Sequence, residues 1–554
     1  MKRSAAILVF LMCVGIAYAS AISPAKIPLT SPLYAQTDLL YRLHGMLSPS
    51  SARPWSVSEA AEVLSAIPEQ SAFTDLLHAT QSLLKEAKPK VRSDAFAYNL
   101  MTTINLESYA HTNTEDFVTI EDWVYGYDQR QSMVDFTMQV QYHDRFYFDI
   151  SVPVGISAAS DSDEPITNPD PIGALFGSGE IEYQKIACLY QMGLSTNLIT
   201  PETNLYADWP RSSQLSLGGD WWSVSGGRGS LRWGNGMSGD LVVGSHINNH
   251  NHFSASVFSK DNKLQFLAIF LPNPLKDDTK QSIFLGHRLE SNLRPWLRLS
   301  FTENAMYKGP SLPLRYYDPT YFYHNLYDGD HMNAIASIEA DILIAPALSF
   351  HGQFALDQYQ LSNESDSVAN ALAHLLQLTY SWKACGGYWS ISGEYVSTDP
   401  SFYRRDDVDF LLARGLHNNG EPVLIDYLGY QYGSDSKVYH AQLSYLIPQR
   451  GEIKGSLTIH RQGEVDYFAF HHENDDGTGN NTDDPNISGP SPSGNTITER
   501  LIIGLGGTYH TSIANLTLYG QLNWIGRRTY DRSTEHAENY ADDFQVVFGV
   551  TKQF

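Results

Sequence analysis

The sequence predicts a membrane-spanning antiparallel β-barrel of about 18 strands that follows a small helical segment. Three observations predict this fold. Apolar and polar residues alternate along the segments from Phe96 to Phe554. In the same region, short turns and long polar connections follow one another in regular order. No later run of about 18 apolar residues follows the N-terminal leader, which excludes a helical membrane protein.

The composition is typical of such a barrel. The 554 residues include 33 Tyr, 24 Phe, 10 Trp and 41 Gly, and only 18% of them are charged. Aromatic girdles and glycine-rich strands give this bias. The formal net charge of −24 argues against nucleic acid as a partner, because binding phosphate needs a basic surface.

Residues 1–19 are expected to be a secretory signal peptide. Lys2 and Arg3 precede a short apolar run, and Ala17-Tyr18-Ala19 offers small residues for cleavage after Ala19. Cys13 raises a lipoprotein alternative, but Leu11-Met12 is bulky where a lipobox has small residues. Cys188 and Cys385 remain after cleavage, so one disulfide is open, while two cysteines cannot build a metal cluster.

Residues 20–92 are predicted to be a periplasmic helical segment. Ser56 and Glu59 form a capping-box pattern before apolar residues at helical spacing, and Pro68 ends the run. Two further amphipathic stretches lie at Tyr34–Leu47 and around Phe73–Leu84. So small a bundle buries too little surface to be stable alone, so we expect it to dock on the barrel, with a flexible arm as the alternative.

Residues 93–554 are predicted to be the barrel. Hairpins of alternating residues recur, with runs of about 9–12 residues that suit tilted strands. The apolar sets include Phe136–Tyr142, Ile338–Ile344, Leu348–Leu356, Leu376–Trp382, Tyr439–Tyr445, Ile453–Ile459, Leu501–Tyr509, Leu516–Trp524 and Phe544–Phe554. The last set ends in Phe, like the closing strand that outer-membrane assembly machinery recognises, although Lys552 departs from that pattern.

The connections indicate the number of strands and their orientation. Long Asp-, Asn-, Gly-, Ser- and Pro-rich segments lie at about 155–210, 235–250, 305–330, 399–435, 462–497 and 526–542. Outer-membrane barrels have short periplasmic turns and long extracellular loops, so both chain ends are expected in the periplasm. The strands between about 211 and 234 give the weakest signal, so 16 strands is the alternative to 18.

Several short motifs resemble the Wzi family of capsule-assembly outer-membrane proteins. The motifs are Ser31-Pro32-Leu33-Tyr34, Leu39-Leu40-Tyr41-Arg42-Leu43, Arg53-Pro54-Trp55-Ser56, Arg232-Trp233-Gly234-Asn235-Gly236, Gly286-His287-Arg288-Leu289-Glu290 and the hairpin from Asn333 to Asp357. The resemblance implies an 18-stranded barrel with a periplasmic helical bundle. It also implies a surface role in holding or organising a polysaccharide capsule.

The predicted outer loops are acidic. They carry Asp406, Asp407, Asp409, Asp475, Asp476, Asp483, Asp484, Asp531, Glu535, Glu538, Asp542 and Asp543. Such loops repel an acidic glycan. A bound polysaccharide is therefore expected to be neutral, or to be held through a local basic patch or bridging Ca²⁺.

No motif indicates an enzyme, and no catalytic residue, cofactor or metal site is predicted. The sequence lacks a G-x-S-x-G elbow, a P-loop and an H-E-x-x-H motif. His246, His250 and His252 lie close together, but exposed loop histidines explain them better than a metal. The acidic stretch from Asn474 lacks the Glu that ends a calcium loop, because Pro485 occupies that place.

Charged residues on the polar faces of strands are the candidates for a lumen or ligand site, because charges facing lipid are costly. They are Arg288, Glu290, Arg298, Glu339, Asp341 and Asp357, to which we add Trp233 as a residue that could stack on sugar. The favoured interpretation is a structural salt-bridge network that fills the interior. A ligand or selectivity site is the alternative.

Three functions remain open on the sequence. The first is a barrel that binds or anchors surface polysaccharide, as the Wzi resemblance implies. The second is a porin-like channel for small solutes, which the even strand number and polar inner faces suggest. The third is an adhesin that uses the long loops. The expected partners are outer-membrane lipid, the assembly machinery and surface polysaccharide, and we expect a monomer in a Gram-negative-type envelope.

Overall fold

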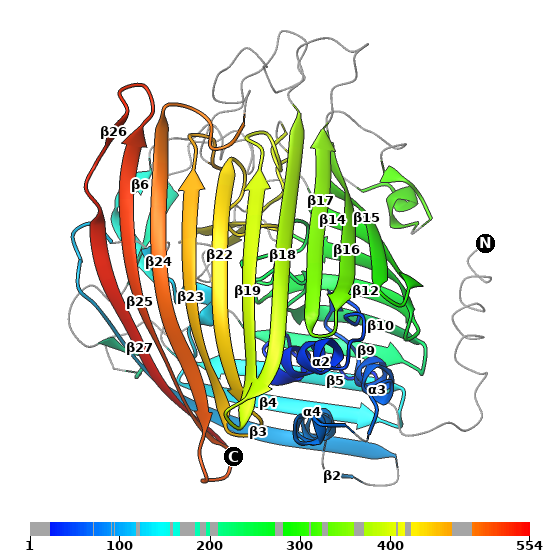
Figure 1. Ribbon diagram of the computed structural model, residues 1–554. Helices are drawn as coiled ribbons and strands as arrows, with labels where there is room; N and C mark the ends of the chain where they lie inside the picture. Colours follow the sequence, from blue (N-terminus) through cyan, green and yellow to red (C-terminus); the bar gives the residue numbers. More distant parts are fainter. Residues whose placement is uncertain are drawn as a thin grey trace.

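The chain closes into an antiparallel β-barrel of 18 strands in this computed structural model (Figure 1). The structure describes residues 23–69, 71–89, 91–92, 95–117, 122–155, 159–166, 183–188, 195–199, 209–271, 281–309, 312–318, 320–323, 331–358, 370–405, 408–415, 423–467 and 490–554. The expected signal peptide at 1–19 and the acidic stretch from Asn474 to Pro485 lie outside these residues.

Each barrel strand pairs with its neighbours in chain order. In that order the strands are β3 (Phe96–His111), β4 (Val134–Tyr142), β5 (Phe146–Val154), β9 (Ser212–Gly218), β10 (Trp222–Gly229), β12 (His250–Phe258), β13 (Asn262–Phe270), β14 (Gln281–Arg294), β15 (Leu297–Gly309), β16 (Met332–Ala345), β17 (Leu348–Gln358), β18 (Ala371–Ala384), β19 (Gly387–Thr398), β22 (Ser436–Ile447), β23 (Gly451–Gln462), β24 (Thr496–His510), β25 (Leu516–Asp531) and β27 (Ala541–Gln553).

The first and last strands close the barrel. β27 pairs with β3, with Val550 opposite Leu106, so neither strand is left with a free edge. The strands β9 and β10 occupy the region with the weakest sequence signal, and they decide for 18 strands over 16.

Short pieces of strand complete the secondary structure. β2 (Val91–Arg92) and β8 (Ser195–Thr196) pair with β3, and β26 (His536–Ala537) pairs with β25. Three two-stranded sheets stand apart from the barrel wall: β1 (Ala52–Arg53) with β11 (Arg232–Trp233), β6 (Ala159–Ile166) with β7 (Tyr183–Cys188), and β20 (Leu411–Gly415) with β21 (Val423–Tyr427). Two 3-10 turns, η2 (Tyr127–Gln129) and η3 (Leu314–Tyr317), lie in connections.

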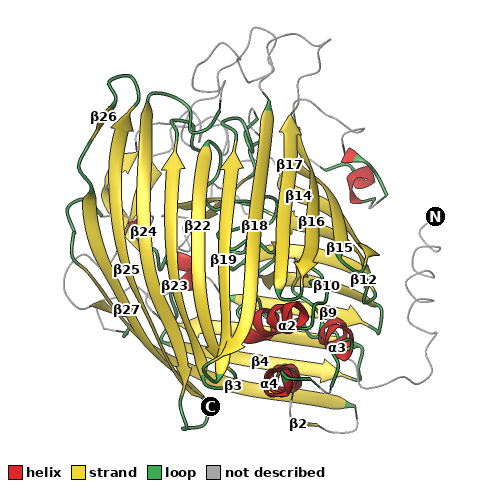
Figure 2. Cartoon of the chain, viewed as in Figure 1, coloured by secondary structure: helices red, strands yellow, loops and turns green. Residues whose placement is uncertain are grey.

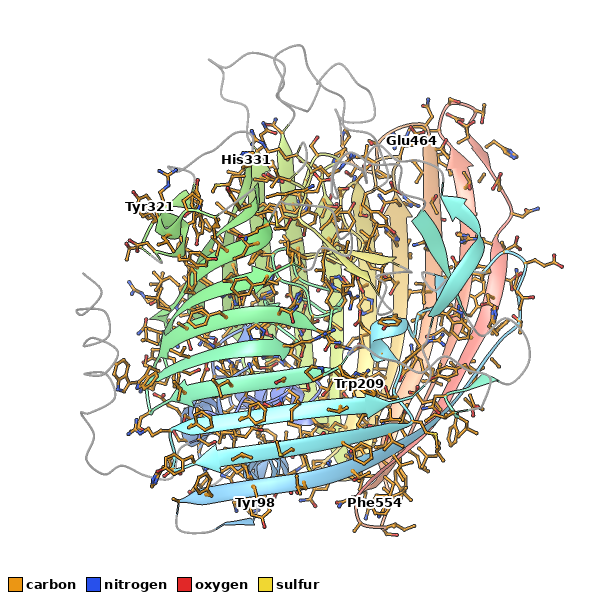
Figure 3. All side chains as sticks on the ribbon, turned by 180° about the vertical axis from the view of Figure 1, so that it is seen from behind. Tyr98, Trp209, Tyr321, His331, Glu464 and Phe554 are labelled. Atoms are coloured by element: carbon orange, nitrogen blue, oxygen red, sulfur yellow. The ribbon has the colours of Figure 1, made fainter. Side chains whose placement is uncertain are left out.

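The two ends of the barrel differ, as the sequence predicts. One end carries tight turns, such as the one between β18 and β19, where Cys385 and Gly386 have φ of 54° and 76°. This left-handed geometry matches the twist of the flanking strands. Tyr98 and Phe554 lie at this short-turn end, and His331 and Glu464 lie at the opposite, long-loop end (Figure 3). Cys385 is exposed and free, and the side chain of Cys188 lies outside the described part of the chain.

The outer face of the barrel is apolar and the inner face is polar. On β27, Phe544, Val546 and Phe548 are exposed, while Asp543, Gln545 and Val547, which alternate with them, are buried. β18 exposes Leu376, Leu378 and Tyr380 in the same way. The alternation that the sequence predicts therefore separates a hydrocarbon-facing belt from an enclosed interior.

Within the described residues, three helices precede the barrel and cover its short-turn end (Figure 2). They are α2 (Pro32–Leu43), α3 (Val57–Ser65) and α4 (Thr74–Glu86). Ser56 caps α3 as predicted, because its Oγ accepts a hydrogen bond from the Glu59 amide at 3.1 Å. The capping box also predicts that the Glu59 carboxylate accepts from the Ser56 amide, and this part of the prediction is wrong. The carboxylate pairs instead with Lys263 of β13, at 2.7 Å. None of the described helices is long and apolar enough to cross a membrane.

The helices are docked on the barrel, which confirms that expectation over a flexible arm. The Ala347 amide between β16 and β17 donates to the Arg42 carbonyl at 2.9 Å, and the Lys260 amide donates to Glu62 at 2.9 Å. At a third turn, Lys383 pairs with Asp75 at 2.9 Å. Contacts to three different turns fix the bundle across the opening.

Two long connections fold into the barrel. Segments 230–249 and 399–435 supply most of a buried apolar cluster with residues of the wall, including Leu241, Val243, Phe402, Tyr403 and Tyr430. The sequence suggests outer loops for both segments, but much of their length is internal. Asp409, which the sequence assigns to an acidic outer loop, is 6% exposed and accepts a hydrogen bond from the Arg405 amide at 2.7 Å.

Replacing Leu378 with Arg should destabilise the barrel by about 2–4 kcal/mol, because the charge would face hydrocarbon near the middle of β18. Unfolding by guanidinium in lipid vesicles measures this change. Ile513→Arg, in the short turn after β24, is the matched control and should stay within about 0.5 kcal/mol of the parent. Equal effects at both positions would contradict the assigned membrane face.

The helical bundle contacts the barrel through one buried ion pair, Glu59 with Lys263, and one exposed ion pair, Asp75 with Lys383. Lys263→Leu should cost about 3–5 kcal/mol, because it leaves the Glu59 carboxylate buried without its cation. Lys383→Leu removes the exposed pair with Asp75 and should cost at most about 1 kcal/mol. Limited proteolysis within residues 23–89 should then cut the first variant much faster than the second; similar rates would contradict this docking.

Candidate functional site

The strand charges predicted as candidates form a buried network. Arg288 on β14 pairs with Glu290 at 2.7 Å and with Glu339 of β16 at 2.9 Å. Arg288 also donates to the Ser51 hydroxyl at 2.6 Å, so the network ties the N-terminal segment to the wall. Arg298 is 3% exposed and donates to Asn292 at 2.8 Å.

The remaining candidates hold the internal segments. Nδ1 of His351 donates to the Asp341 carboxylate at 2.9 Å, and Nε2 of the same ring accepts from the Asn235 amide of the internal segment at 3.3 Å. Asp357, half-buried, accepts from the Tyr403 amide at 2.8 Å. Trp233 is 2% exposed and its indole N–H donates to Gln265 at 3.1 Å. Its ring therefore packs in the interior and is not open for stacking on a sugar.

This network does not favour a metal. Within the described residues one group of three, Glu339, Asp341 and His351, brings ligand atoms within 4.8 Å of one another. Arg288 already neutralises Glu339, and a backbone amide occupies His351. His246, His250 and His252 do not form such a group among the described residues. The interpretation of exposed loop histidines is wrong for His250 and His252, which lie on β12 and are 1% and 3% exposed.

A separate cavity of about 850 Å³ lies beside the strands β22 to β25. Alternate residues of β23 form one wall, and polar residues of the neighbouring strands extend it. The polar wall comprises His440, Gln442, Glu452, Lys454, Ser456, Thr458, His460, Gln462, Arg500, Thr508, Tyr519, Gln521 and Asn523. None of the seven candidates from the sequence lies on this wall.

The connection between β3 and β4 forms the facing wall. Its residues 122–129, which we call the strap, reach the cavity together with Phe117 and the internal hairpin β20–β21. Glu107 of β3 anchors the strap by accepting hydrogen bonds from Tyr125 and from Tyr519 of β25, both at 2.6 Å. Asp122 of the strap pairs with Arg527 at 2.7 Å.

Arg414 joins the strap to the internal hairpin. Its guanidinium pairs with Asp128 at 2.8 Å and with Asp426 at 2.6 Å. Burial alone would raise the pKa of Asp128, but the Arg414 charge lowers that pKa below its usual value. The pair therefore stays ionised near neutral pH and holds the two elements together.

The cavity wall presents unused hydrogen-bonding groups. Asn523 is fully buried and its Nδ2 has no partner within the described structure, and the same holds for Nδ1 of His460. Tyr432 packs against the His460 ring, with 4.3 Å between ring centroids. Other described residues also have buried polar atoms without partners, such as Arg298 Nη1, so these two nitrogens indicate a ligand only because they belong to residues that line the cavity.

The sequence held a signal for this wall. Lys454, Ser456, Thr458, His460 and Gln462 are alternate polar residues of one strand. Every strand of a barrel has such a face, however, and only the tertiary structure decides which face stays open and which is covered by internal segments.

Arg414→Met should release the strap from the internal hairpin and widen the cavity. It leaves Asp128 and Asp426 without their cation, and two like charges then repel across the hairpin. Planar-bilayer recording should show a larger single-channel conductance than the parent protein. Arg461→Met, which removes a half-exposed cation paired with Glu499, is the control and should leave conductance unchanged. An unchanged Arg414→Met conductance would contradict this role.

Comparisons with known proteins agree with the fold. No protein-family model matches the chain, and no curated protein matches its sequence. Among solved structures, Wzi of Escherichia coli is similar over 95% of this chain and 99% of its own, with a TM-score of 0.56 and 14% identity. It is described as an outer-membrane protein involved in group 1 capsule assembly and as a carbohydrate-binding β-barrel.

Other matched structures are more distant. OccAB4 of Acinetobacter baumannii matches 84% of this chain and 100% of its own, with a TM-score of 0.38 and 10% identity. OccK3 of Pseudomonas aeruginosa matches 82% and 95%, with a TM-score of 0.38 and 7% identity. The likeness to Wzi confirms, at the level of the fold, the resemblance that the sequence motifs predict.

Proposed function

We propose that this protein is a Wzi-like outer-membrane barrel that binds or anchors a surface polysaccharide. The observation that carries the proposal is the cavity of about 850 Å³, which is lined by alternate polar side chains of β22 to β25. The Wzi structure, described as carbohydrate-binding, supports the same class of ligand.

The chemistry of the wall suits sugars. Sugar hydroxyls need amide, hydroxyl and imidazole partners, and the wall offers Gln442, Thr458, Gln521 and Asn523. Aromatic rings can pack on the apolar faces of sugar rings, and Tyr432 lies on the same wall. The volume is within the range of ordinary small-ligand sites, so it suits a short segment of a chain rather than a whole polymer.

The orientation follows from the same proposal. Both chain ends and the helices would lie in the periplasm, and the long loops would lie outside. The cavity reaches Gln462, the last residue of β23, and so approaches the long-loop end where a surface polymer arrives. Outer-membrane lipid and the assembly machinery would be the other partners of a monomeric, non-enzymatic barrel.

A porin-like channel is the second candidate, and the same cavity is the observation that favours it. Internal segments and the helical bundle fill much of the rest of the barrel, as the apolar cluster around Tyr403 indicates. We therefore rank binding above diffusion. Ion-conductance measurements on the parent protein separate the two, because steady conductance without polysaccharide binding would favour the porin.

Gln442→Ala combined with Gln521→Ala should weaken polysaccharide binding about 10- to 30-fold, since each lost hydrogen bond contributes about 1 kcal/mol. Calorimetry with the detergent-solubilised protein and polysaccharide extracted from the source cells measures it. Gln553→Ala, at the exposed end of β27, is the control and should bind like the parent. Deleting the gene should in parallel release polysaccharide into the medium. No binding by the parent protein, with unchanged cell-bound polysaccharide, would refute the proposal.

A further inference from the structure

The cavity contains one cation that no carboxylate neutralises within the described chain. Seven residues of the wall carry a full charge: Asp122, Asp128, Asp426, Glu452, Lys454, Asp466 and Arg500. Asp122 pairs with Arg527, and Lys454 pairs with Glu452 at 2.9 Å. Arg414 pairs with Asp128 of the strap and with Asp426 of the hairpin.

Arg500 differs from these groups. It is half-buried on the inner face of β24, opposite His460 on β23 and Arg527 on β25, and forms no hydrogen bond or ion pair with the described residues. The remaining carboxylate, Asp466, acts electrostatically on Tyr427. Burial raises the pKa of the Tyr432 hydroxyl and Arg500 opposes that rise, so the guanidinium lies within electrostatic range of the aromatic wall.

On the outer face of the same strands, by contrast, the arginines form ion pairs. One residue away from His460 and Arg500, Arg461 pairs with Glu499 at 2.7 Å, and Arg528 pairs with Glu499 at 2.6 Å. Tyr540 donates to the same carboxylate at 2.5 Å. The two outward cations thus share the Glu499 carboxylate, whereas the inward Arg500 faces the cavity without an acidic partner among the described residues.

We infer that Arg500 binds the carboxylate of an acidic sugar in the polysaccharide, with Asn523 and His460 donating to neighbouring oxygens of the same residue. A guanidinium binds carboxylate through paired hydrogen bonds, and charge attracts more strongly away from bulk water than at an exposed site. The two unpartnered nitrogens lie on the same wall, and both can act as donors. This inference rests on the proposed function and deepens it by naming the class of ligand.

The geometry also resolves an electrostatic conflict. A chain with a formal net charge of −24 repels an acidic polymer at its surface. Among the described residues that line the cavity, Arg500 is a cation without an acidic partner, and it gives an acidic sugar an attractive position away from the acidic loops. Recognition would therefore occur in the cavity and not on the loops.

A double comparison tests the inference. The extracted surface polysaccharide is used before and after its carboxyl groups are reduced to alcohols, and each form is titrated into the parent protein and Arg500→Gln. The parent should lose about tenfold or more in affinity on carboxyl reduction. Arg500→Gln should bind both forms alike, at the level of the parent with reduced polymer, and Arg500→Lys should recover part of the difference. Heat-modifiable migration on gels verifies that each variant is folded.

Arg461→Gln is the matched control, because it removes a cation one residue from His460 on the outer face of β23, and it should keep the full preference for the acidic form. If the parent binds native and reduced polymer equally, or if Arg500→Gln keeps the preference, the inference is overturned while polysaccharide binding stands. Equal weakening of both forms by Arg500→Gln also overturns it, since Arg500 would then not read the carboxylate. Binding of neither form by the parent refutes the proposed function itself. Competition by inorganic sulfate at the affinity of the polymer would identify a small-anion site instead and would overturn the sugar assignment.

Discussion

The pairing of β27 with β3 is the contact on which the rest of the structure depends. Hydrocarbon offers no hydrogen-bonding partner, so every backbone amide of the wall must bond to a neighbouring strand and no edge can remain free. Closure in turn encloses a volume. Each strand then has one face in lipid and one face toward that volume, and the inner residues determine whether it becomes a channel, a plug or a binding site.

This barrel fills most of its interior with its own chain. The segments 230–249 and 399–435 bring apolar side chains inward, where no lipid or water covers them, and the apolar cluster around Leu241 and Tyr403 results. Charged wall residues then need partners on those segments and on the N-terminal region. Arg288, Glu290 and Glu339 meet Ser51 for this reason, since a buried charge without a partner costs several kcal/mol.

The cavity is the part of the barrel interior that these internal segments do not occupy. It lies beside β22 to β25, where the strap and the internal hairpin stop short of the wall. The two sets of polar residues therefore differ in role although both face inward. The charges around Arg288 are paired with one another, while Arg500 in the cavity has no acidic partner among the described residues and is available to a ligand. Glu107, which accepts from Tyr125 and Tyr519, fixes the strap to the wall of the cavity.

The sequence by itself determined the barrel and the helices before it, and it narrowed the number of strands to 16 or 18. Period-two alternation, as at Phe544 to Phe554, and helical spacing after Ser56 are local patterns that a single chain displays. It also indicated that the charges at Arg288 and Glu339 face inward, because lipid would reject them. The tertiary structure alone decided which connections fold inside, which inner faces they cover, and that Glu59 reaches Lys263 instead of its own helix end. The physical reason is that alternation fixes the side of the sheet on which a residue lies, whereas burial and pairing depend on segments hundreds of residues away, and no local pattern encodes them.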